Sequence, residues 1–429
     1  MSAFLTLAAI GYIIFAVLNI FSRPGHFAAV YLLSYGLAVF FGSIGPIAGA
    51  VSLVATFAAF NAHKERLSVL PAEWFLAVWI GTMLLSMFTT PQMDITVVYV
   101  ASIVLLAAGS YLYARAFATA PHFFEDLLLG SVIITTLCAI RIFQMTDTIG
   151  VLGDSINMTH VGLATLPELA LLGVISFLIF HRPHPWWVSV GLLLFMFGLV
   201  FPFTAALGTR SVILSVGIAS VLLLGLRIFQ EGGGKIIGII SVGLGLIVTL
   251  IAVFWTELQT SRYGILVLVG SSRLSSGAGA GNLEGDTSAQ LRFELYDQAW
   301  RIFFRHPIFG SGAGSFGYLA DGANGAYPHN MFLEILVQSG LFGLAIYSLF
   351  FIPLAVKGLR QSLQSPASWN TIFPLSIFIS ALIRHQVSMT ITQGKLFFFA
   401  LGCFAAYAVA TEKSASRTSE NGTPQTQPS

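Results

Sequence analysis

Residues 327–344 read YPHNMFLEILVQSGLFGL, and they mark the point where the longest polar stretch of the chain gives way to an apolar run. The polar stretch covers residues 257–328. Five arginines fall in it: Arg262, Arg273, Arg292, Arg301 and Arg305. Polar groups are costly in a lipid environment, so an apolar chain that keeps so many together has a use for them. We therefore expect the chemistry of this protein in and beside that stretch.

The composition is that of a membrane protein. Of 429 residues, 56% are hydrophobic and 9% are charged, whereas charged residues make up about a quarter of an ordinary soluble domain. Apolar runs long enough to cross a bilayer recur along the chain, so we expect an all-α polytopic bundle. Cys138 and Cys403 both lie in apolar runs and indicate neither a disulfide framework nor a zinc site. The N-terminus lacks a basic flank and a cleavage site, which predicts a retained span.

Hydropathy predicts about twelve or thirteen spans. They fall near 2–22, 27–42, 44–60, 73–90, 94–114, 125–143, 161–180, 186–206, 211–229, 235–256, 330–357, 371–386 and 396–411. We expect four parts: an N-terminal transmembrane bundle (1–256), a large extracytoplasmic loop with the catalytic motifs (257–328), C-terminal transmembrane helices (329–411) and a disordered cytoplasmic tail (412–429).

Basic residues indicate which side each connection faces. If the apolar region 27–60 is divided at 42–46, the basic residues of the connections fall on one face, which the positive-inside rule assigns to the cytoplasm. They are Arg23, Lys64, Arg66, Arg115, Arg182, Arg227, Lys235, Lys357, Arg360, Lys413 and Arg417. The 257–328 loop then lies on the outer side.

Other ionisable residues lie within the spans or at their outer ends: Arg141, Glu168, Arg210, Arg384 and His385. Charges kept inside a membrane bundle usually face its interior and mark a site. The alternative is that the arginines reach from the helix ends to the membrane surface, which for Arg141 and Arg384 taken alone is an equally good interpretation. The grouping of five such residues beside an arginine-rich loop favours a site at the outer mouth.

The second half of the loop predicts a helix. Thr287-Ser288-Ala289-Gln290 has the spacing of a capping box, and His306-Pro307 ends the helix because a proline ring clashes with continued helical backbone. A helix over about 288–305 would have an apolar face formed by Leu291, Leu295, Ala299, Ile302 and Phe303. Arg292 flanks this face and can reach across the outer mouth.

The glycine-rich segment 310–314 has two interpretations. A glycine-rich turn can present backbone amides to an anion. However, no strand precedes the segment and it lies on the outer side, which is unlike a nucleotide site. We therefore favour tight packing of the loop against the bundle.

His329 precedes a span, on the outer side. Taken alone it would be a helix cap and an anchor at the membrane surface. With Arg210 and Arg292 beside it, we favour a proton acceptor or a hydrogen-bonding partner of the substrate, because histidine changes its charge near neutral pH.

Four motifs occur together between about residues 190 and 350: Gly208-Thr209-Arg210-Ser211, residues 292–300, His306-Pro307-Ile308-Phe309-Gly310-Ser311-Gly312, and His329-Asn330 through Gly340-Leu341-Phe342-Gly343. The combination resembles the O-antigen ligase and O-antigen polymerase family of bacterial envelope enzymes. The resemblance implies an inverting glycosyltransferase of the bacterial inner membrane that uses no metal, no nucleotide sugar and no cofactor. Its donor would be a glycan on a polyprenyl pyrophosphate carrier at the periplasmic face. Its acceptor would be lipid A–core in a ligase or a growing glycan in a polymerase; no nucleic acid is expected.

The resemblance also implies roles for single residues. The family's arginine near a span start matches Arg210, its loop arginine matches Arg292, and its histidine at the end of the loop matches His329. We expect these three to be catalytic. We expect substrate to be bound by Arg141, Glu168, Arg384, Asn330 and Arg301.

The chemistry of a pyrophosphate leaving group agrees with these roles. Forked guanidinium groups suit phosphate oxygens better than ammonium groups do, and in a water-poor mouth they stabilise the developing charge without reorganising. Glu168, about 10 Å below the membrane surface, is a second candidate base. The alternative for Glu168 is a carboxylate paired with Arg141 or Arg384.

Other functions remain in competition. Ligase and polymerase are equally good readings, as are an exopolysaccharide or capsule polymerase and a protein-directed glycosyltransferase. A transporter or flippase would also be polytopic, but it would bind substrate near the midplane at broken helices, often within inverted repeats. The charges gather at one face instead and no clear repeat is evident. A structural scaffold would leave the arginines unexplained.

Overall fold

The computed structural model describes residues 2–41, 45–63, 69–88, 90–145, 160–181, 184–207, 210–231, 287–320, 327–364 and 368–421. Within these ranges every regular element is a helix, which confirms the all-α class. The expected span at 235–256 and the first half of the loop, 257–286, lie outside the described residues.

Six helical segments among the described residues are long and apolar enough to cross a membrane. They are Met93–Phe117 (α6 Met93–Ser102, η1 Ile103–Ala108 and α7 Gly109–Phe117), Phe123–Gln144 (in α8, Phe123–Met145), Trp186–Thr204 (α11 Trp186–Phe195, η3 Met196–Val200 and the start of α12, Phe201–Leu207), Ser211–Ile228 (in α13, Arg210–Glu231), Met331–Gln364 (α18) and Lys395–Glu412 (in α20, Lys395–Asn421). The number is up to 7 if α2 (Pro24–Leu32) and α3 (Ser34–Phe41), which meet at 68°, form one span.

The other expected spans in the described ranges also coincide with helices, which are shorter or less apolar. They are α1 (Ser2–Leu18), α4 (Gly45–His63), α5 (Pro71–Ser86), α10 (Thr165–Phe180, preceded by α9, His160–Leu163) and α19 (Trp369–Val387). Helix α10 is buried along most of its length, as expected for a short apolar helix enclosed in a core. The apolar pattern thus located the helices, and in the described part of the chain six or seven segments also have the length and composition of a membrane span.

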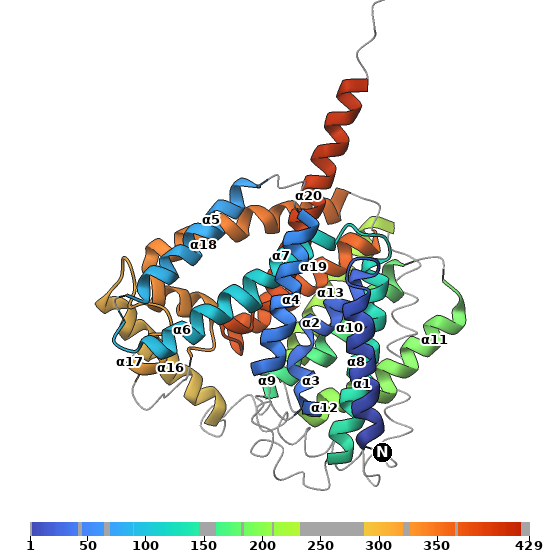
Figure 1. Cartoon of the computed structure of the whole chain (residues 1–429), viewed down its shortest axis with the longest axis horizontal. Helices are drawn as coiled ribbons and strands as arrows, with labels where there is room; N and C mark the ends of the chain where they lie inside the picture. The colour runs from blue at the N-terminus through green and yellow to red at the C-terminus, as the bar shows by residue number, and fades with distance from the viewer. Residues whose placement is uncertain are drawn as a thin grey trace, which may run out of the picture.

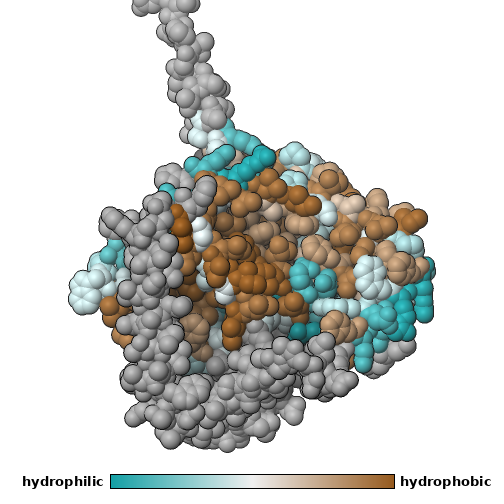
Figure 2. All heavy atoms as spheres, turned by 180° about the vertical axis from the view of Figure 1, so that it is seen from behind, coloured by the Kyte–Doolittle hydropathy of each residue, from teal (hydrophilic) through white to brown (hydrophobic). Residues whose placement is uncertain are grey.

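The helices are arranged around two sets of contacts (Figure 1). Helix α18 lies beside α5, and α16 (Thr287–Arg305) packs on α18. Helices α10, α13 and α19 contact one another, and α20 packs against α7, α18 and α19. Figure 2 shows a face on which hydrophobic residues form a broad surface. A soluble monomer rarely exposes such a surface, so we assign it to contact with lipid.

Two ion pairs lie where α8 and α5 begin. Arg23 Nη2 lies 2.5 Å from Asp126 Oδ1, and Arg115 Nε lies 3.0 Å from Glu73 Oε1. Both acids occupy the first turn of their helices, where the helix dipole favours negative charge. Two of the basic residues that the positive-inside rule placed on the cytoplasmic face are therefore paired within the protein.

Helix α16 runs over Thr287–Arg305, which confirms the helix expected in the loop. Its buried face packs on Leu333, Leu336 and Val337 of α18 and consists of Leu295, Ala299, Ile302 and Phe303. Leu291 was also expected on this face but is 53% exposed. The buried part of the apolar face begins one turn later, at Leu295.

Helix α18 is interrupted at Gly340, where φ is 64° and ψ is −164°. In a continuous helix the amides of residues 341 and 342 would satisfy the carbonyls of residues 337 and 338. Here residues 307–312 provide the hydrogen-bond partners of these amides and of these carbonyls. The amides of residues 311 and 312 donate to carbonyls 337 and 338 at 2.8 and 2.9 Å, and carbonyls 307 and 308 accept from amides 341 and 342 at 2.9 and 3.0 Å.

This arrangement explains the glycine-rich segment. Gly310 has a φ of 71°, and a Cβ there would collide with the backbone of Gln338; a Cβ at Gly340 would collide with the carbonyl of Ile308. Only glycine adopts this left-handed backbone readily while allowing so close an approach. The amides of Ser311 and Gly312 are occupied, so the packing interpretation is confirmed and the segment does not present these amides to an anion.

Helix α20 continues to Asn421, although residues 412–429 were expected to be a disordered tail. Between Gly402 and Gly422 the sequence holds neither glycine nor proline, so nothing stops the helix of the last span from continuing. It ends directly before Gly422, the residue type that most often follows a helix C-terminus. Residues 422–429 lie outside the described part of the chain.

Candidate functional site

Residues 327–329, at the end of the loop, contact the C-terminal end of α19. Because α19 stops at Val387, its last carbonyls have no helical partner. The Ser388 carbonyl accepts hydrogen bonds from Tyr327 Oη at 3.3 Å and from His329 Nδ1 at 3.2 Å. The ring centroids of Tyr327 and His329 are 4.3 Å apart. Residues far apart in the sequence therefore hold the His329 imidazole between a backbone carbonyl and an aromatic ring.

The bond to Ser388 determines the tautomer of His329. A carbonyl oxygen only accepts, so Nδ1 must carry the hydrogen, and in the neutral ring Nε2 is then an acceptor. His329 also has a φ of 54°, which is uncommon for a residue other than glycine. Such backbone conformations persist only where the surroundings enforce them, and they are concentrated at functional sites.

The surroundings also favour the neutral form. Burial lowers the pKa of His329 below its ordinary value of 6.5, and the positive charge of Arg292 lowers it further, whereas the Ser388 carbonyl opposes this change. His329 is therefore neutral at physiological pH. A neutral imidazole with an accepting Nε2 is the form that a general base requires.

Arg292 lies on α16 and its charge acts on three groups of the site. It opposes the rise that burial causes in the pKa of Tyr296 and of Tyr327, and it helps to lower the pKa of His329. Arg384 likewise opposes the rise in the pKa of Tyr327, which burial and Glu334 bring to about 12. Both arginines thus act electrostatically on the tyrosine that packs on His329.

Arg301 does not join this group. It forms an ion pair with Asp297, and both side chains are exposed. Nine residues separate Arg301 from Arg292, which at about 100° per residue places them on opposite sides of the helix. The expectation that Arg301 binds substrate gains no support from this position.

Asn330 is the cap of α18. Its Oδ1 accepts from the amides of Phe332 and Leu333 at 3.0 and 3.1 Å, and its Nδ2 donates to the Gln386 carbonyl at 3.3 Å. Tyr296 Oη donates to the same carbonyl at 3.3 Å. Asn330 was expected to bind substrate, but its amide is already engaged on both sides and serves to fix His329 next to it.

Glu168 and Arg384 form a buried ion pair, with side chains 1% and 0% exposed. Ser380 Oγ donates to Glu168 Oε1 at 2.7 Å and lies 2.9 Å from Ser215 Oγ on α13. Of the two partners considered for Glu168, the structure selects Arg384. The network joins α10, α13 and α19, and so fixes the helix that begins at Arg210 relative to the helix that ends beside His329.

The structure describes the side chain of Arg141 but not that of Arg210. Arg141 lies four residues before the end of α8, and its Nε is buried with no hydrogen-bond partner among the described residues. Arg210 is the first residue of α13, but its side chain lies outside the described part of the structure. Described residues include no group of three or more His, Cys, Asp or Glu side chains placed to hold a metal ion.

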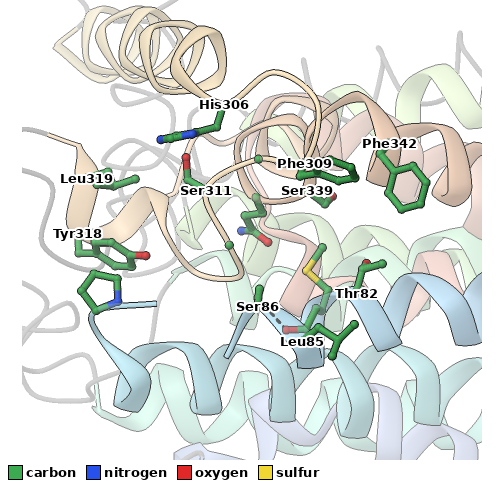
Figure 3. Close-up of a pocket in the computed structure, with 15 residues that line it drawn as sticks. Thr82, Leu85, Ser86, His306, Phe309, Ser311, Tyr318, Leu319, Ser339 and Phe342 are labelled. Atoms are coloured by element: carbon green, nitrogen blue, oxygen red, sulfur yellow. Dashed lines mark hydrogen bonds between the residues drawn. The ribbon is translucent and has the colours of Figure 1, made fainter. Parts of the chain in front are cut away.

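An open groove of about 630 Å³ lies beside the break in α18 (Figure 3). Its walls are the last turn of α5, the segment that follows α16, α17 (Phe316–Leu319) and residues 338–342. Leu85, Phe309 and Phe342 present exposed apolar surface there, at 67%, 70% and 45%. Neither His329 nor Arg292 lines it. Its volume falls within the range of small-molecule sites, which are mostly apolar.

Sequence reasoning assigned no role to Glu334, a buried acid in the first turn of α18. Its carboxylate accepts from Tyr99 Oη at 2.6 Å, Thr390 Oγ1 at 2.5 Å and the Ile391 amide at 2.9 Å. The signal was present in the sequence, because an acidic residue inside an apolar span is costly and usually has a function.

The fold and the site define a polytopic helical membrane protein with a histidine and arginine centre at one end of its bundle. Residues 199–348 match the model of the O-antigen ligase family. The matched region contains Arg210, Arg292 and His329. No curated protein matches the chain. The family supports membrane glycan transfer of the O-antigen ligase and polymerase type.

Proposed function

We propose that this protein is an inverting glycosyltransferase that moves a glycan from a polyprenyl pyrophosphate carrier to an acceptor hydroxyl at the periplasmic face of the bacterial inner membrane. One observation carries the proposal: His329, held through Nδ1 on the Ser388 carbonyl, is a neutral base beside the cation Arg292. The family match supplies the class of substrate.

His329 acts on the acceptor. As the acceptor oxygen attacks the anomeric carbon, its proton passes to His329 Nε2. The bond between the anomeric carbon and the pyrophosphate oxygen breaks, and its electron pair leaves with the pyrophosphate. Attack from the side opposite the leaving group inverts the configuration at the anomeric carbon. The proton on His329 then passes to solvent.

Arginines act on the leaving group. Arg292 offers a forked, permanently charged donor for the pyrophosphate oxygens, and Arg210 is its proposed partner at the start of α13. The buried Nε of Arg141, which has no partner among the described residues, is available to a further oxygen. In this proposal the guanidinium groups supply the positive charge that a metal ion would otherwise provide.

We assign the groove beside α18 to the carrier chain. Its exposed apolar side chains suit an isoprenoid, and its open side allows a long chain to continue into the bilayer. The acceptor is lipid A–core or a growing glycan, since both present a sugar hydroxyl. The break in α18 does not favour the transporter alternative. The backbone amides and carbonyls at the break are hydrogen-bonded to residues 307–312 and are therefore not free to bind a solute.

The proposal is tested with the purified protein in nanodiscs, given a synthetic polyprenyl pyrophosphate glycan and an acceptor. We expect release of polyprenyl pyrophosphate that depends on the acceptor and is insensitive to EDTA. In proteoliposomes, movement of the donor across the bilayer with its glycosidic bond intact would instead establish a flippase.

A further inference from the structure

Glu334 and His329 lie five residues apart at the start of α18, and both contact the turn that follows α19. His329 reaches the carbonyl of Ser388. Glu334 reaches two residues further along the turn, where it accepts from Thr390 Oγ1 through Oε1 and from the Ile391 amide through Oε2. Asn330, between them, reaches Gln386. One end of α18 therefore holds the turn at Ser388, Thr390 and Ile391, and it holds the last turn of α19 through Asn330.

We propose that Glu334 is a positioning residue for the transfer reaction, because it fixes the turn at 388–391 and thereby the carbonyl that orients the His329 imidazole. The proposal rests on the function given above, in which His329 is the base. Glu334 itself is 1% exposed and does not touch the reacting atoms in this scheme.

The hydrogen-bond donors around Glu334 explain why a carboxylate is suited to this position. The Ile391 amide can only donate, and the hydroxyls of Tyr99 and Thr390 also donate to Glu334. A carboxylate has two oxygens that only accept, and so it satisfies all three. Gln338 Nε2 adds a longer contact at 3.4 Å. Without the carboxylate these buried donors would lack a partner, which is costly, and the turn would be free to move.

The substitutions divide into those that release the turn and those that do not. Glu334→Ala removes both oxygens. Glu334→Gln keeps an oxygen for the Ile391 amide and can donate to the two hydroxyls, which also accept, so the turn stays in place. Tyr99→Phe is a second control, since it removes one donor to the carboxylate and leaves both contacts of Glu334 with the turn, to Thr390 and to the Ile391 amide.

The experiment follows the position of His329 directly. In nanodiscs, the imidazole of His329 is titrated by NMR with histidine-labelled protein, and its signal is assigned by its loss in His329→Gln. Glu334→Ala should move the titration midpoint away from the wild-type value, because release of the turn alters both the Ser388 hydrogen bond that raises the pKa of the ring and the burial that lowers it. The transfer rate should fall at least tenfold, and its acid limb should move with the midpoint. Glu334→Gln and Tyr99→Phe should keep the wild-type midpoint and most of the rate.

The other charged or titratable groups around His329 stay unchanged in these variants: Arg292 on α16, Tyr327 beside it, and Arg384 and His385 in the last turn of α19. If Glu334→Ala does not fold, Thr390→Val weakens the same anchor and should shift the midpoint in the same direction. A folded Glu334→Ala or Thr390→Val protein with the wild-type midpoint would overturn the proposal. Wild-type transfer by His329→Gln would refute the base and not the anchoring of the ring, which the titration measures separately.

Discussion

Glu168 and Arg384 form an ion pair in which both side chains are buried, although they are 216 residues apart in the sequence. Removing one partner of a buried pair leaves a charge without compensation and typically costs about 3–5 kcal/mol. We predict that Glu168→Ala lowers the melting temperature and the membrane abundance of the protein. The double variant Glu168→Ala with Arg384→Met should recover much of the loss, because neither charge remains. A Glu168→Ala protein that melts like the wild type but transfers no glycan would instead make Glu168 a base.

Arg292 and Arg301 offer a matched comparison on one helix. Arg292 acts on the site, whereas Arg301 pairs with Asp297 on the exposed side. Loss of one preorganised donor to a transition-state charge typically costs about 10²–10³ in rate, so we predict a loss of that order for Arg292→Ala. Arg292→Lys should also be impaired because the fork is lost. Arg301→Lys should transfer normally. Equal rates for the two Lys variants at equal abundance would remove the pyrophosphate role of Arg292.

The pH dependence of transfer should follow His329. Only the neutral ring accepts a proton, so activity is present above the His329 pKa and is lost as the pH falls through it. Because burial and Arg292 both lower that pKa, the acid limb of the rate should lie below 6.5. Residual transfer by Arg292→Gln should show an acid limb at higher pH, since one of the two lowering influences is gone. An acid limb that stays in place in this variant would contradict the coupling.

The KM for the polyprenyl donor should depend on the width of the groove. Thr82 lines it from α5, and Thr82→Trp would fill part of the space. We predict a higher KM for a long-chain polyprenyl donor and a smaller change for a donor with two or three isoprene units. Leu84→Trp is the control, since Leu84 is exposed on the same helix outside the groove. If Thr82→Trp affects long and short donors equally, the chain lies elsewhere.

The helices could be read from the sequence because hydrophobic runs and helix punctuation are local signals. The boundaries of α16 followed from its capping pattern and from His306-Pro307. The separation of Arg301 from Arg292 could also have been read, since nine residues amount to half a turn beyond two full turns. In contrast, the break at Gly340 depends on backbone contacts with residues 307–312, which no local pattern encodes.

The sequence predicted which residue types form the site, but it predicted only some of the contacts between them. His329 at the start of α18 and Arg292 on α16 were expected to lie together, and the charge of Arg292 does act on His329. The choice of Arg384 over Arg141 as the partner of Glu168 required the packing of α10 on α19. Asn330 and Glu334 take up structural positions around His329 because α19 ends there. That α19 ends beside the start of α18 depends on tertiary packing, which no local sequence pattern shows.

The most direct test of the account is the single-turnover rate of glycan transfer by His329→Ala in nanodiscs, at saturating donor and acceptor. Loss of a general base lowers the rate by about 10²–10⁴-fold, and we predict a loss of that order with donor binding and melting temperature close to wild type. His184→Ala, at a histidine just before α11 and outside the site, should transfer normally. Transfer by His329→Ala at the wild-type rate would contradict the account.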